Sequence, residues 1–200
     1  RAGITGTDGA SHNGMWDMAL LAHVPGLRLA APRDEATLRE SLRTAVSTDD
    51  SPTVVRYPKG ALPEPLTALR RLGPESEEPG RGGDPVHQDT PSVSAFDVVD
   101  VLLESRRPAG GARILLVGVG AMATQAYEAG RLLEQEGYAV TVVHPHWVIP
   151  APAPLVTAAA DVDVVVVVED GLVDGGIGSQ LRDAVEEYQA AHGATGASPV

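Results

Sequence analysis

The densest group of polar side chains in the chain lies in a glycine-rich stretch near its start. The stretch reads Gly6-Thr7-Asp8-Gly9-Ala10-Ser11-His12-Asn13-Gly14. Glycines let a backbone approach a ligand closely, and Asp8 and His12 can hydrogen-bond a carbonyl or hydroxyl group and assist proton transfer. A helix is predicted to follow, and helix N-termini favour anionic groups. The pattern predicts a substrate site, and a turn with an aspartate cap and an exposed histidine is the alternative.

A second group of candidate residues carries positive charge. The segment Arg56-Tyr57-Pro58-Lys59-Gly60 follows a short predicted strand, at the end where open α/β sheets bind ligands. The Arg56 guanidinium and the Lys59 ammonium both suit a phosphate, and Arg1 joins them only if the chain folds back. Spacing alone favours two solvated cations beside a proline turn.

Three further motifs carry less chemistry. The run Gly118-Val119-Gly120-Ala121-Met122-Ala123 fits a dinucleotide fingerprint, but the acidic residue expected about 20 positions later is missing, which favours a tight strand-to-helix turn. The pair His144 and His146 has no third ligand at a suitable spacing, so no metal site is predicted. Glu169 and Asp170 precede a glycine loop that either meets an anion or another subunit, or caps a helix.

The elements that position these residues alternate between strand and helix. In the first third we expect a helix over 14–23 capped by Ser11 or Asn13, a strand over 27–31, a helix over 35–47 capped by Asp34, and a strand over 53–57. The 35–47 helix is predicted to turn Ala36, Leu38, Leu42, Ala45 and Val46 inward. Later strands are expected over 113–117, 138–143 and 162–169, and helices over 124–136, 152–160 and 177–190.

This alternation predicts an α/β fold in two domains. Residues 61–95 are rich in proline and glycine and contain the acidic cluster Glu75, Glu77 and Glu78, which predicts a flexible linker between 1–60 and 96–200. The all-apolar strand Val164–Val168 is typical of a parallel sheet covered on both faces.

Composition excludes several classes of function. The 200 residues include no cysteine, which rules out disulfides, thiolate metal sites and a cysteine nucleophile. The net charge of −12 comes wholly from residues after position 60, because the first 60 are neutral, and a field of that sign repels nucleic acid and anionic lipid. No apolar run reaches membrane-spanning length and no signal pattern follows Arg1, so a cytoplasmic fragment is expected.

The motifs together resemble a known family. The stretch from Arg1 to Met18, the run Ala31-Pro32-Arg33-Asp34-Glu35 and the segment Val55 to Gly60 are similar to signature stretches of 1-deoxy-D-xylulose-5-phosphate synthases. Val117 to Ala123 and Val168 to Ser179 are similar to the C-terminal domain of the same family. The resemblance covers about 1–60 and 112–185. Transketolases and 2-oxoacid dehydrogenase β subunits share the architecture but fit these segments less well.

The resemblance implies the end of a transketolase-like pyrimidine-binding domain followed by a transketolase C-terminal-like domain with a mostly parallel sheet. The implied activity is a thiamine-diphosphate- and Mg²⁺-dependent condensation of pyruvate with glyceraldehyde 3-phosphate, with loss of carbon dioxide, feeding isoprenoid, thiamine and pyridoxal phosphate synthesis. Arg1 and Lys59 would hold the aldehyde's phosphate, with Arg56 beside them. Asp8 and His12 would contact the substrate carbonyl and hydroxyls and assist proton transfer. A homodimer is also implied.

The chain also departs from the family pattern. The magnesium and diphosphate motif and the cofactor-activating glutamate belong to an N-terminal part not found here, and a last strand is expected beyond Val200. His144-Pro145-His146-Trp147 stands where relatives usually read Asp-Pro-Arg-Trp. These departures leave a second hypothesis, a non-catalytic copy that dimerises with or regulates an intact synthase. A nicotinamide-dependent oxidoreductase, which rests only on Gly118 to Ala123, is the third.

Overall fold

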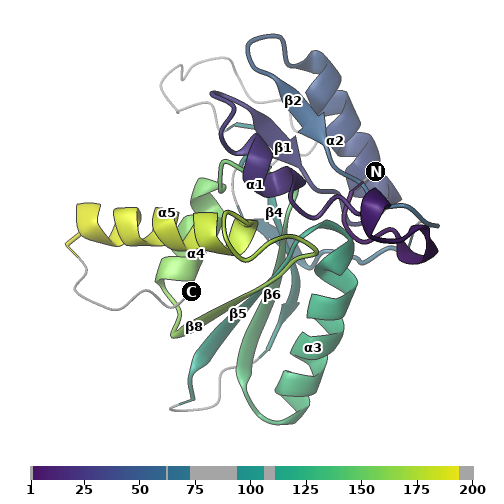
Figure 1. The fold of residues 1–200 in the computed structure, drawn as a ribbon. Helices are drawn as coiled ribbons and strands as arrows, with labels where there is room; N and C mark the ends of the chain where they lie inside the picture. The colour runs from purple at the N-terminus through teal and green to yellow at the C-terminus, as the bar shows by residue number, and fades with distance from the viewer. Residues whose placement is uncertain (1, 62, 73–93, 106–110, 194–200) are drawn as a thin grey trace, which may run out of the picture.

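A computed structural model describes residues 2–61, 63–72, 94–105 and 111–193 (Figure 1). Within these ranges the polypeptide forms two sheets with helices packed around them. The predicted α/β class is confirmed. Arg1 and most of the expected linker lie outside the described residues.

The smaller sheet has the strand order β2-β1-β7. Strands β1 (Arg28–Ala30) and β2 (Thr53–Val55) are parallel and are connected by helix α2 (Glu35–Ser47), as their order in the sequence predicts. Strand β7 (Trp147–Ile149) comes from far along the chain and pairs antiparallel with β1. The late segment of the chain therefore completes the sheet of the early segment.

The larger sheet has the order β3-β4-β6-β5-β8. Its strands are β3 (Arg70–Leu72), β4 (Val99–Glu104), β5 (Arg113–Gly118), β6 (Ala139–Pro145) and β8 (Val164–Val168). β6, β5 and β8 are parallel, whereas β3 and β4 are antiparallel additions, so the sheet is mixed. Neither β3 nor β4 has a predicted counterpart, and β3 lies within the expected linker.

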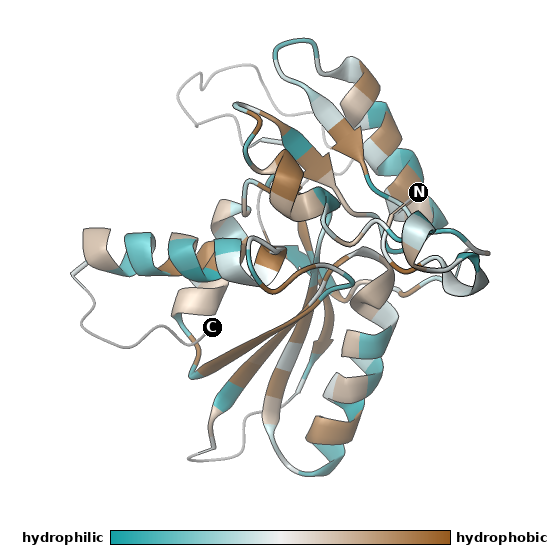
Figure 2. Ribbon diagram, viewed as in Figure 1, coloured by the Kyte–Doolittle hydropathy of each residue, from teal (hydrophilic) through white to brown (hydrophobic). Residues whose placement is uncertain are grey.

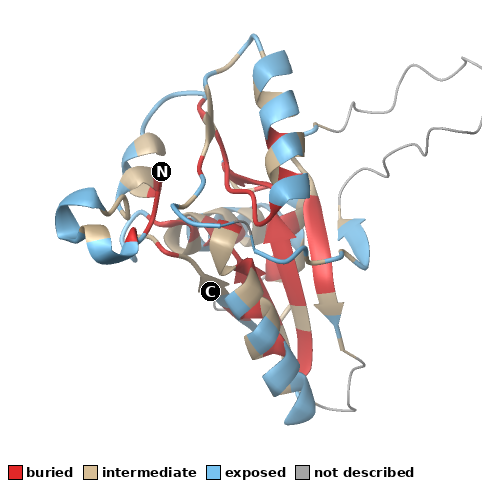
Figure 3. Ribbon diagram, turned by 90° about the vertical axis from the view of Figure 1, so that its right-hand side faces the viewer, coloured by how far each residue is buried: buried red, intermediate tan, exposed pale blue. Residues whose placement is uncertain are grey.

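Helices cover both faces of the larger sheet (Figures 1 and 3). Along β5, Leu115 and Val117 face α4 (Ala153–Ala160) and α5 (Ile177–Ala191), whereas Leu116 faces α3 (Ala123–Gln135). This alternation follows from the two-residue period of a strand. Among the described residues, no helix is both long enough and apolar enough to cross a membrane.

The strand of five valines differs from its prediction. β8 lies at an edge of the described sheet, and Val164 and Val166 are 39% and 43% exposed. A continuous apolar run predicts burial, but it cannot distinguish a central strand from an edge strand, because that position depends on pairing with distant residues.

Two helix predictions need correction. Helix α1 spans only Asp17–Leu21, and Trp16 occupies its N-cap position, so neither Ser11 nor Asn13 caps it. Instead the Asn13 side chain accepts hydrogen bonds from Thr5, through the backbone N–H at 3.0 Å and the hydroxyl at 3.1 Å. Asn13 therefore braces the glycine-rich segment.

Helix α2 has the predicted range and cap but a different buried face. The Asp34 side chain accepts a hydrogen bond from the Thr37 backbone N–H at 2.9 Å. In return, the Thr37 hydroxyl accepts one from the Asp34 backbone N–H at 3.1 Å. Both side chains are buried, and this fixes the rotation of the helix so that Thr37 and Ser41 point inward. Leu42 and Val46, which were predicted to be inward, are 44% and 87% exposed.

An apolar cluster joins the two sheets. It combines side chains from α1, the β1 region, the β5–α3 turn, β7 and α5, and its buried members are Met18, Leu27, Leu29, Ala31, Val119, Val148, Ile149 and Ile177. In Figure 2, brown segments occur in α1 and along the strands of the larger sheet. Because the cluster draws on both halves of the chain, the two halves bury apolar surface against each other.

A group of buried charges crosses the same interface. The Arg33 guanidinium donates to Asp100 at 2.5 Å, and Asp100 also accepts from Arg71 at 3.0 Å and lies 2.9 Å from His146 Nε2. Burial alone would raise the pKa of Asp100, but the hydrogen bonds and charges of His146 and Arg33 outweigh it and hold that pKa well below its usual range. His146, between β6 and β7, therefore joins Arg33 and Arg71 around the Asp100 carboxylate.

His144 is fully buried beside this group. Its Nδ1 donates to the Gly118 carbonyl at 3.0 Å, while Nε2 has no hydrogen-bond partner among the described residues. Burial, together with the positive charges of Arg33 and His146, lowers the pKa of His144 to about 3. The imidazole is therefore neutral in the folded protein.

The Gly118–Ala123 run forms the tight turn that the sequence favoured. The strand β5 ends at Gly118, a 3-10 turn η3 spans Gly120–Met122, and α3 begins at Ala123. A Cβ atom on Gly118 would lie 2.5 Å from the Ala123 Cα. The helix itself occupies the space beside this glycine.

Gly118→Ala should lower the free energy of unfolding by about 1–3 kcal/mol, because the added methyl group meets backbone that cannot yield without moving α3. Chemical denaturation followed by circular dichroism measures the change. Gln125→Ala, an exposed substitution in α3, is the control and should change stability little. Equal stability of Gly118→Ala and the native chain would contradict the proposed packing.

His144 should make stability depend on pH. Its pKa is about 3 when folded and 6.5 for an unperturbed histidine, so the unfolded chain binds a proton first as pH falls. The free energy of unfolding should therefore decrease below pH 6.5, at a limiting slope of about 1.4 kcal/mol per pH unit.

Denaturation curves between pH 4 and pH 7 compare the native chain with His144→Gln and with His192→Gln, whose site is exposed. The free energy of unfolding of His144→Gln should change less with pH, by up to that slope. That of His192→Gln should change with pH as the native chain does. A native slope retained in His144→Gln would show that other groups cause the dependence.

Candidate functional site

The glycine-rich segment forms a loop that is closed at its neck. Gly3 and Gly14 form an antiparallel bridge, with N···O distances of 3.3 and 2.9 Å, and the Thr5–Asn13 hydrogen bonds lie just inside it. Two short 3-10 turns, η1 (Gly6–Asp8) and η2 (Ala10–His12), make up the exposed end of the loop. The backbone therefore fixes the neck, and the two turns beyond it carry a half-buried Asp8 and an exposed His12.

Lys59 lies against this loop. Its ammonium group donates to the Asp8 carboxylate, and the two side chains are 46% and 25% exposed. A parallel bridge between Ala2 and Pro58 holds the start of the chain beside the segment that follows β2, through an Ala2 N–H to Tyr57 carbonyl hydrogen bond of 3.0 Å. The fold thus brings together Asp8 and Lys59, which are 51 positions apart.

His12 lies on η2, exposed, with its Nδ1 3.0 Å from the Ser11 hydroxyl. It shares the loop with Asp8, and its exposed ring can exchange protons with a ligand or solvent. Arg1 lies outside the described residues, so its predicted place beside Lys59 stays a prediction.

Arg56 occupies a different environment from Lys59. It is 6% exposed, and its guanidinium donates to Asp17 at 2.8 Å and to Asp170 at 2.7 Å. Its positive charge is therefore met by two carboxylates of this chain, one from α1 and one from the loop after β8. Local spacing gives no signal for these partners, since Asp170 is 114 positions from Arg56.

The two acidic residues after β8 act within the fold. Glu169 accepts hydrogen bonds from the N–H groups of Ile177 at 3.0 Å and Gly178 at 2.9 Å, and so caps α5. Asp170 is buried against Gly3, where an added Cβ would overlap its Oδ2. The helix-cap alternative is correct for Glu169, and Asp170 meets an arginine of the same chain.

A cavity of about 100 Å³ lies beside the Lys59 segment. Its lining includes Pro32, Arg33, Asp34, Tyr57, Pro58 and Gly60. Burial alone would raise the pKa of Asp34, but its hydrogen bond from the Thr37 backbone and the adjacent Arg33 charge lower it. Asp34 is therefore ionised and engaged as a helix cap, with Arg33 held by Asp100.

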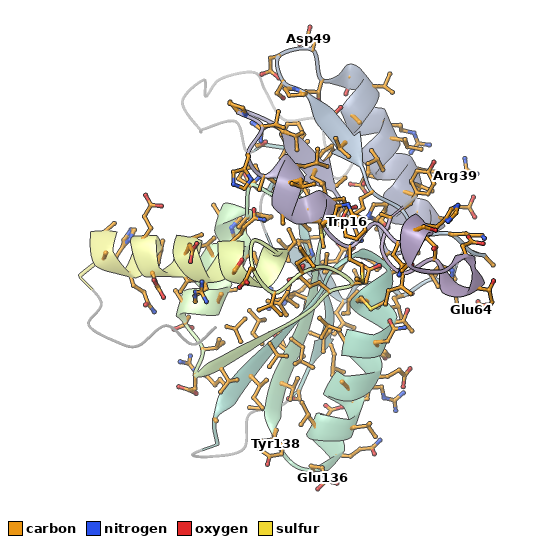
Figure 4. All side chains as sticks on the ribbon, in the orientation of Figure 1. Trp16, Arg39, Asp49, Glu64, Glu136 and Tyr138 are labelled. Atoms are coloured by element: carbon orange, nitrogen blue, oxygen red, sulfur yellow. The ribbon has the colours of Figure 1, made fainter. Side chains whose placement is uncertain are left out.

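Figure 4 labels Trp16 at the start of α1, next to the loop. Trp16 is 46% exposed, and Leu20 on α1 and Val24 just after it are 64% and 41% exposed. Val173, in the loop after β8, is 87% exposed. Within the described ranges, no three histidine, aspartate or glutamate side chains are grouped as a metal site.

Comparisons with known families match both halves of the chain. Residues 1–65 match the transketolase pyrimidine binding domain, and residues 104–197 match the transketolase C-terminal domain. Residues 66–103 lie between the two matches.

Among curated proteins, the chain is similar to 1-deoxy-D-xylulose-5-phosphate synthases. Identity is 45% to the Corynebacterium glutamicum protein and 48% to the Rhodococcus jostii protein, in each case over 92% of this chain. These alignments cover 26% and 24% of the two relatives. The chain thus spans about a quarter of the length of the curated relatives it matches.

Among solved structures, the fold is similar to that of a split-gene transketolase in an inactive β4 tetramer, with a TM-score of 0.61 and 24% identity over 88% of this chain and 50% of that one. A Pichia stipitis transketolase complex with fructose 6-phosphate gives a TM-score of 0.57 and 15% identity over 82% of this chain and 21% of that one. At these identities the likeness shows the fold alone.

The ordered motifs, the two domain matches and the curated relatives agree with one another. The chain joins part of a transketolase pyrimidine-binding domain to a transketolase C-terminal domain, and it resembles the C-terminal portion of 1-deoxy-D-xylulose-5-phosphate synthase.

Proposed function

We propose that this chain supplies the acceptor-substrate contacts of a 1-deoxy-D-xylulose-5-phosphate synthase. The reaction joins pyruvate to glyceraldehyde 3-phosphate with loss of carbon dioxide, and its product serves isoprenoid, thiamine and pyridoxal phosphate synthesis. The single observation that carries the proposal is the position of Lys59, which places a half-exposed cation against the loop of Asp8 and His12.

Each of these side chains has a distinct role in the proposal. Lys59 binds the phosphate of the aldehyde as a point charge. Because the unliganded Lys59 pairs with Asp8, an arriving phosphate competes with that carboxylate for the ammonium group. Asp8 and His12 then contact the carbonyl and hydroxyl groups of the substrate, and the His12 imidazole takes up or returns a proton. Arg1 adds a second cation from the start of the chain.

Arg56 has a revised role in this proposal. Its guanidinium is buried and donates to Asp17 and Asp170, so binding a phosphate directly would require breaking two ion pairs. Removing one partner from a buried charge strongly destabilises the fold, because the remaining charge is left buried without compensation. We therefore assign Arg56 to holding the segment that carries Lys59 rather than to direct contact with substrate.

The cofactor needs residues beyond those described here. A Mg²⁺-bound diphosphate requires converging oxygen ligands, and no three acidic or histidine side chains form such a group within the described ranges. The described residues therefore do not fit thiamine diphosphate and Mg²⁺ by themselves. In a synthase, the N-terminal part would hold the cofactor and supply that chemistry.

A further polypeptide is the proposed partner. The exposed apolar side chains Trp16, Leu20 and Val24, on and beside α1, are surface of the kind that another protein segment covers. A second copy of the chain, as in a homodimer, or the N-terminal part of the synthase would cover this surface. The proposed location of the protein is the cytoplasm.

The test of the proposed function is an assay for 1-deoxy-D-xylulose 5-phosphate. The chain is incubated with pyruvate, glyceraldehyde 3-phosphate, thiamine diphosphate and Mg²⁺, first alone and then with an N-terminal fragment of a related synthase. Product formed only in the mixture supports a half-enzyme with an intact acceptor site. No product from folded partners would favour the second hypothesis, a regulatory copy that binds an intact synthase.

Lys59→Ala should raise the KM for glyceraldehyde 3-phosphate by about ten- to a hundredfold in the active mixture, because a charge-assisted phosphate contact contributes about 1.5–3 kcal/mol. The KM for pyruvate should change little, since pyruvate carries no phosphate. Lys59→Arg keeps the positive charge and is the matched control. Equal losses for both substrates would contradict a phosphate role.

A further inference from the structure

One carboxylate of the C-terminal domain touches both sides of the candidate site. Asp170 accepts from Arg56 Nη1 at 2.7 Å, and its backbone carbonyl lies 3.3 Å from Arg56 Nη2. The same carboxylate lies directly over Gly3, where any Cβ would overlap it. Arg56 is three residues before Lys59, and Gly3 is one end of the bridge that closes the loop of Asp8 and His12.

The Asp170 position is itself fixed within the C-terminal domain. The preceding residue, Glu169, is held by two backbone N–H groups at the start of α5. Val168, the last residue of β8, is held as well, because its carbonyl accepts a hydrogen bond from the Val119 N–H at 3.0 Å. Asp170 therefore projects from a rigid segment between a strand and a capped helix.

We propose that Asp170 is a positioning residue for the Lys59 site, setting the neck of the substrate loop and the Lys59 segment relative to each other from the C-terminal domain. Only the identity of the ligand, a phosphate, rests on the proposed function. The positioning itself rests on the contacts of Asp170 with Arg56 and Gly3.

Asp17 offers an internal comparison. It is the other carboxylate on Arg56, at 2.8 Å from Nε, but it also accepts a hydrogen bond from the N–H of Met18 within its own helix. Its side chain is 24% exposed, whereas that of Asp170 is 6% exposed. Loss of the Asp17 charge should therefore weaken the hold on Arg56 without disturbing the loop neck.

The first experiment measures amide hydrogen exchange by NMR in the unliganded chain and in three variants, Asp170→Asn, Asp17→Asn and Asp174→Asn. The informative amides are Ala2, which donates to Tyr57, and Gly14, which donates to Gly3. His146, whose N–H donates to Val98, reports on the rest of the fold. Asp174 is an exposed carboxylate of the same loop and controls for charge.

In Asp170→Asn, exchange at Ala2 and Gly14 should increase about tenfold, the loss expected for one charged hydrogen bond, while His146 exchanges at its native rate. Asp174→Asn should leave all three rates unchanged, and Asp17→Asn should leave Gly14 unchanged. Unchanged exchange at Ala2 and Gly14 in Asp170→Asn would overturn the proposal. An equal increase at all three amides would also overturn it, because that result is a general loss of stability.

The second experiment titrates inorganic phosphate into the same proteins and follows the amide shifts of the loop. Removing a negative charge by itself strengthens anion binding, so Asp174→Asn should bind phosphate as tightly as the native chain or slightly more tightly. Asp170→Asn should instead bind it about fivefold more weakly, because the site is no longer held in place. Tighter binding by Asp170→Asn would overturn positioning. Absence of phosphate binding by the native chain would count against the proposed function alone, and the exchange rates would then decide the role of Asp170.

Discussion

The buried guanidinium of Arg56 is the interaction on which the arrangement of the site depends. It sits between Asp17 of α1 and Asp170 of the loop after β8, so one side chain connects elements at both ends of the sequence. A buried charge is tolerated only where partners replace its water. Because both carboxylates contact the same guanidinium, the positions of α1 and the β8–α5 loop are coupled to the strand end that carries Lys59.

A second buried ion group reinforces the same interface. Asp100 of β4 accepts from Arg33, from Arg71 of β3 and from His146, which lies between β6 and β7. Strand β7 also pairs with β1. This pairing and the buried ion group together make the first 60 residues and the later residues structurally interdependent. Buried ion pairs add little net stability relative to apolar packing, but they admit few alternative arrangements. The interface is therefore specific in its geometry, which a site assembled from both halves requires.

Several residues that look alike in the sequence have different roles in the fold. Arg56 and Lys59 are both cations after one strand, yet Arg56 is buried between two carboxylates and Lys59 is half-exposed against Asp8. Glu169 and Asp170 are adjacent acids, yet one caps α5 and the other meets Arg56. In each pair the two side chains lie beyond the end of a strand and reach different elements of the fold. The partners available on each side then decide the role.

The sequence by itself determined the α/β class, the range and cap of α2, the turn at Gly118 and the loop of Asp8 and His12, because these depend on contacts between residues close along the chain. Tertiary structure alone decided that β3 and β4 extend the sheet, that β8 lies at its edge and that β7 pairs with β1. It also decided that Arg56 meets Asp170 and that Lys59 meets Asp8. These features are pairings between distant segments, whose free energy comes from burying surfaces and charges together, and no local pattern specifies the partner.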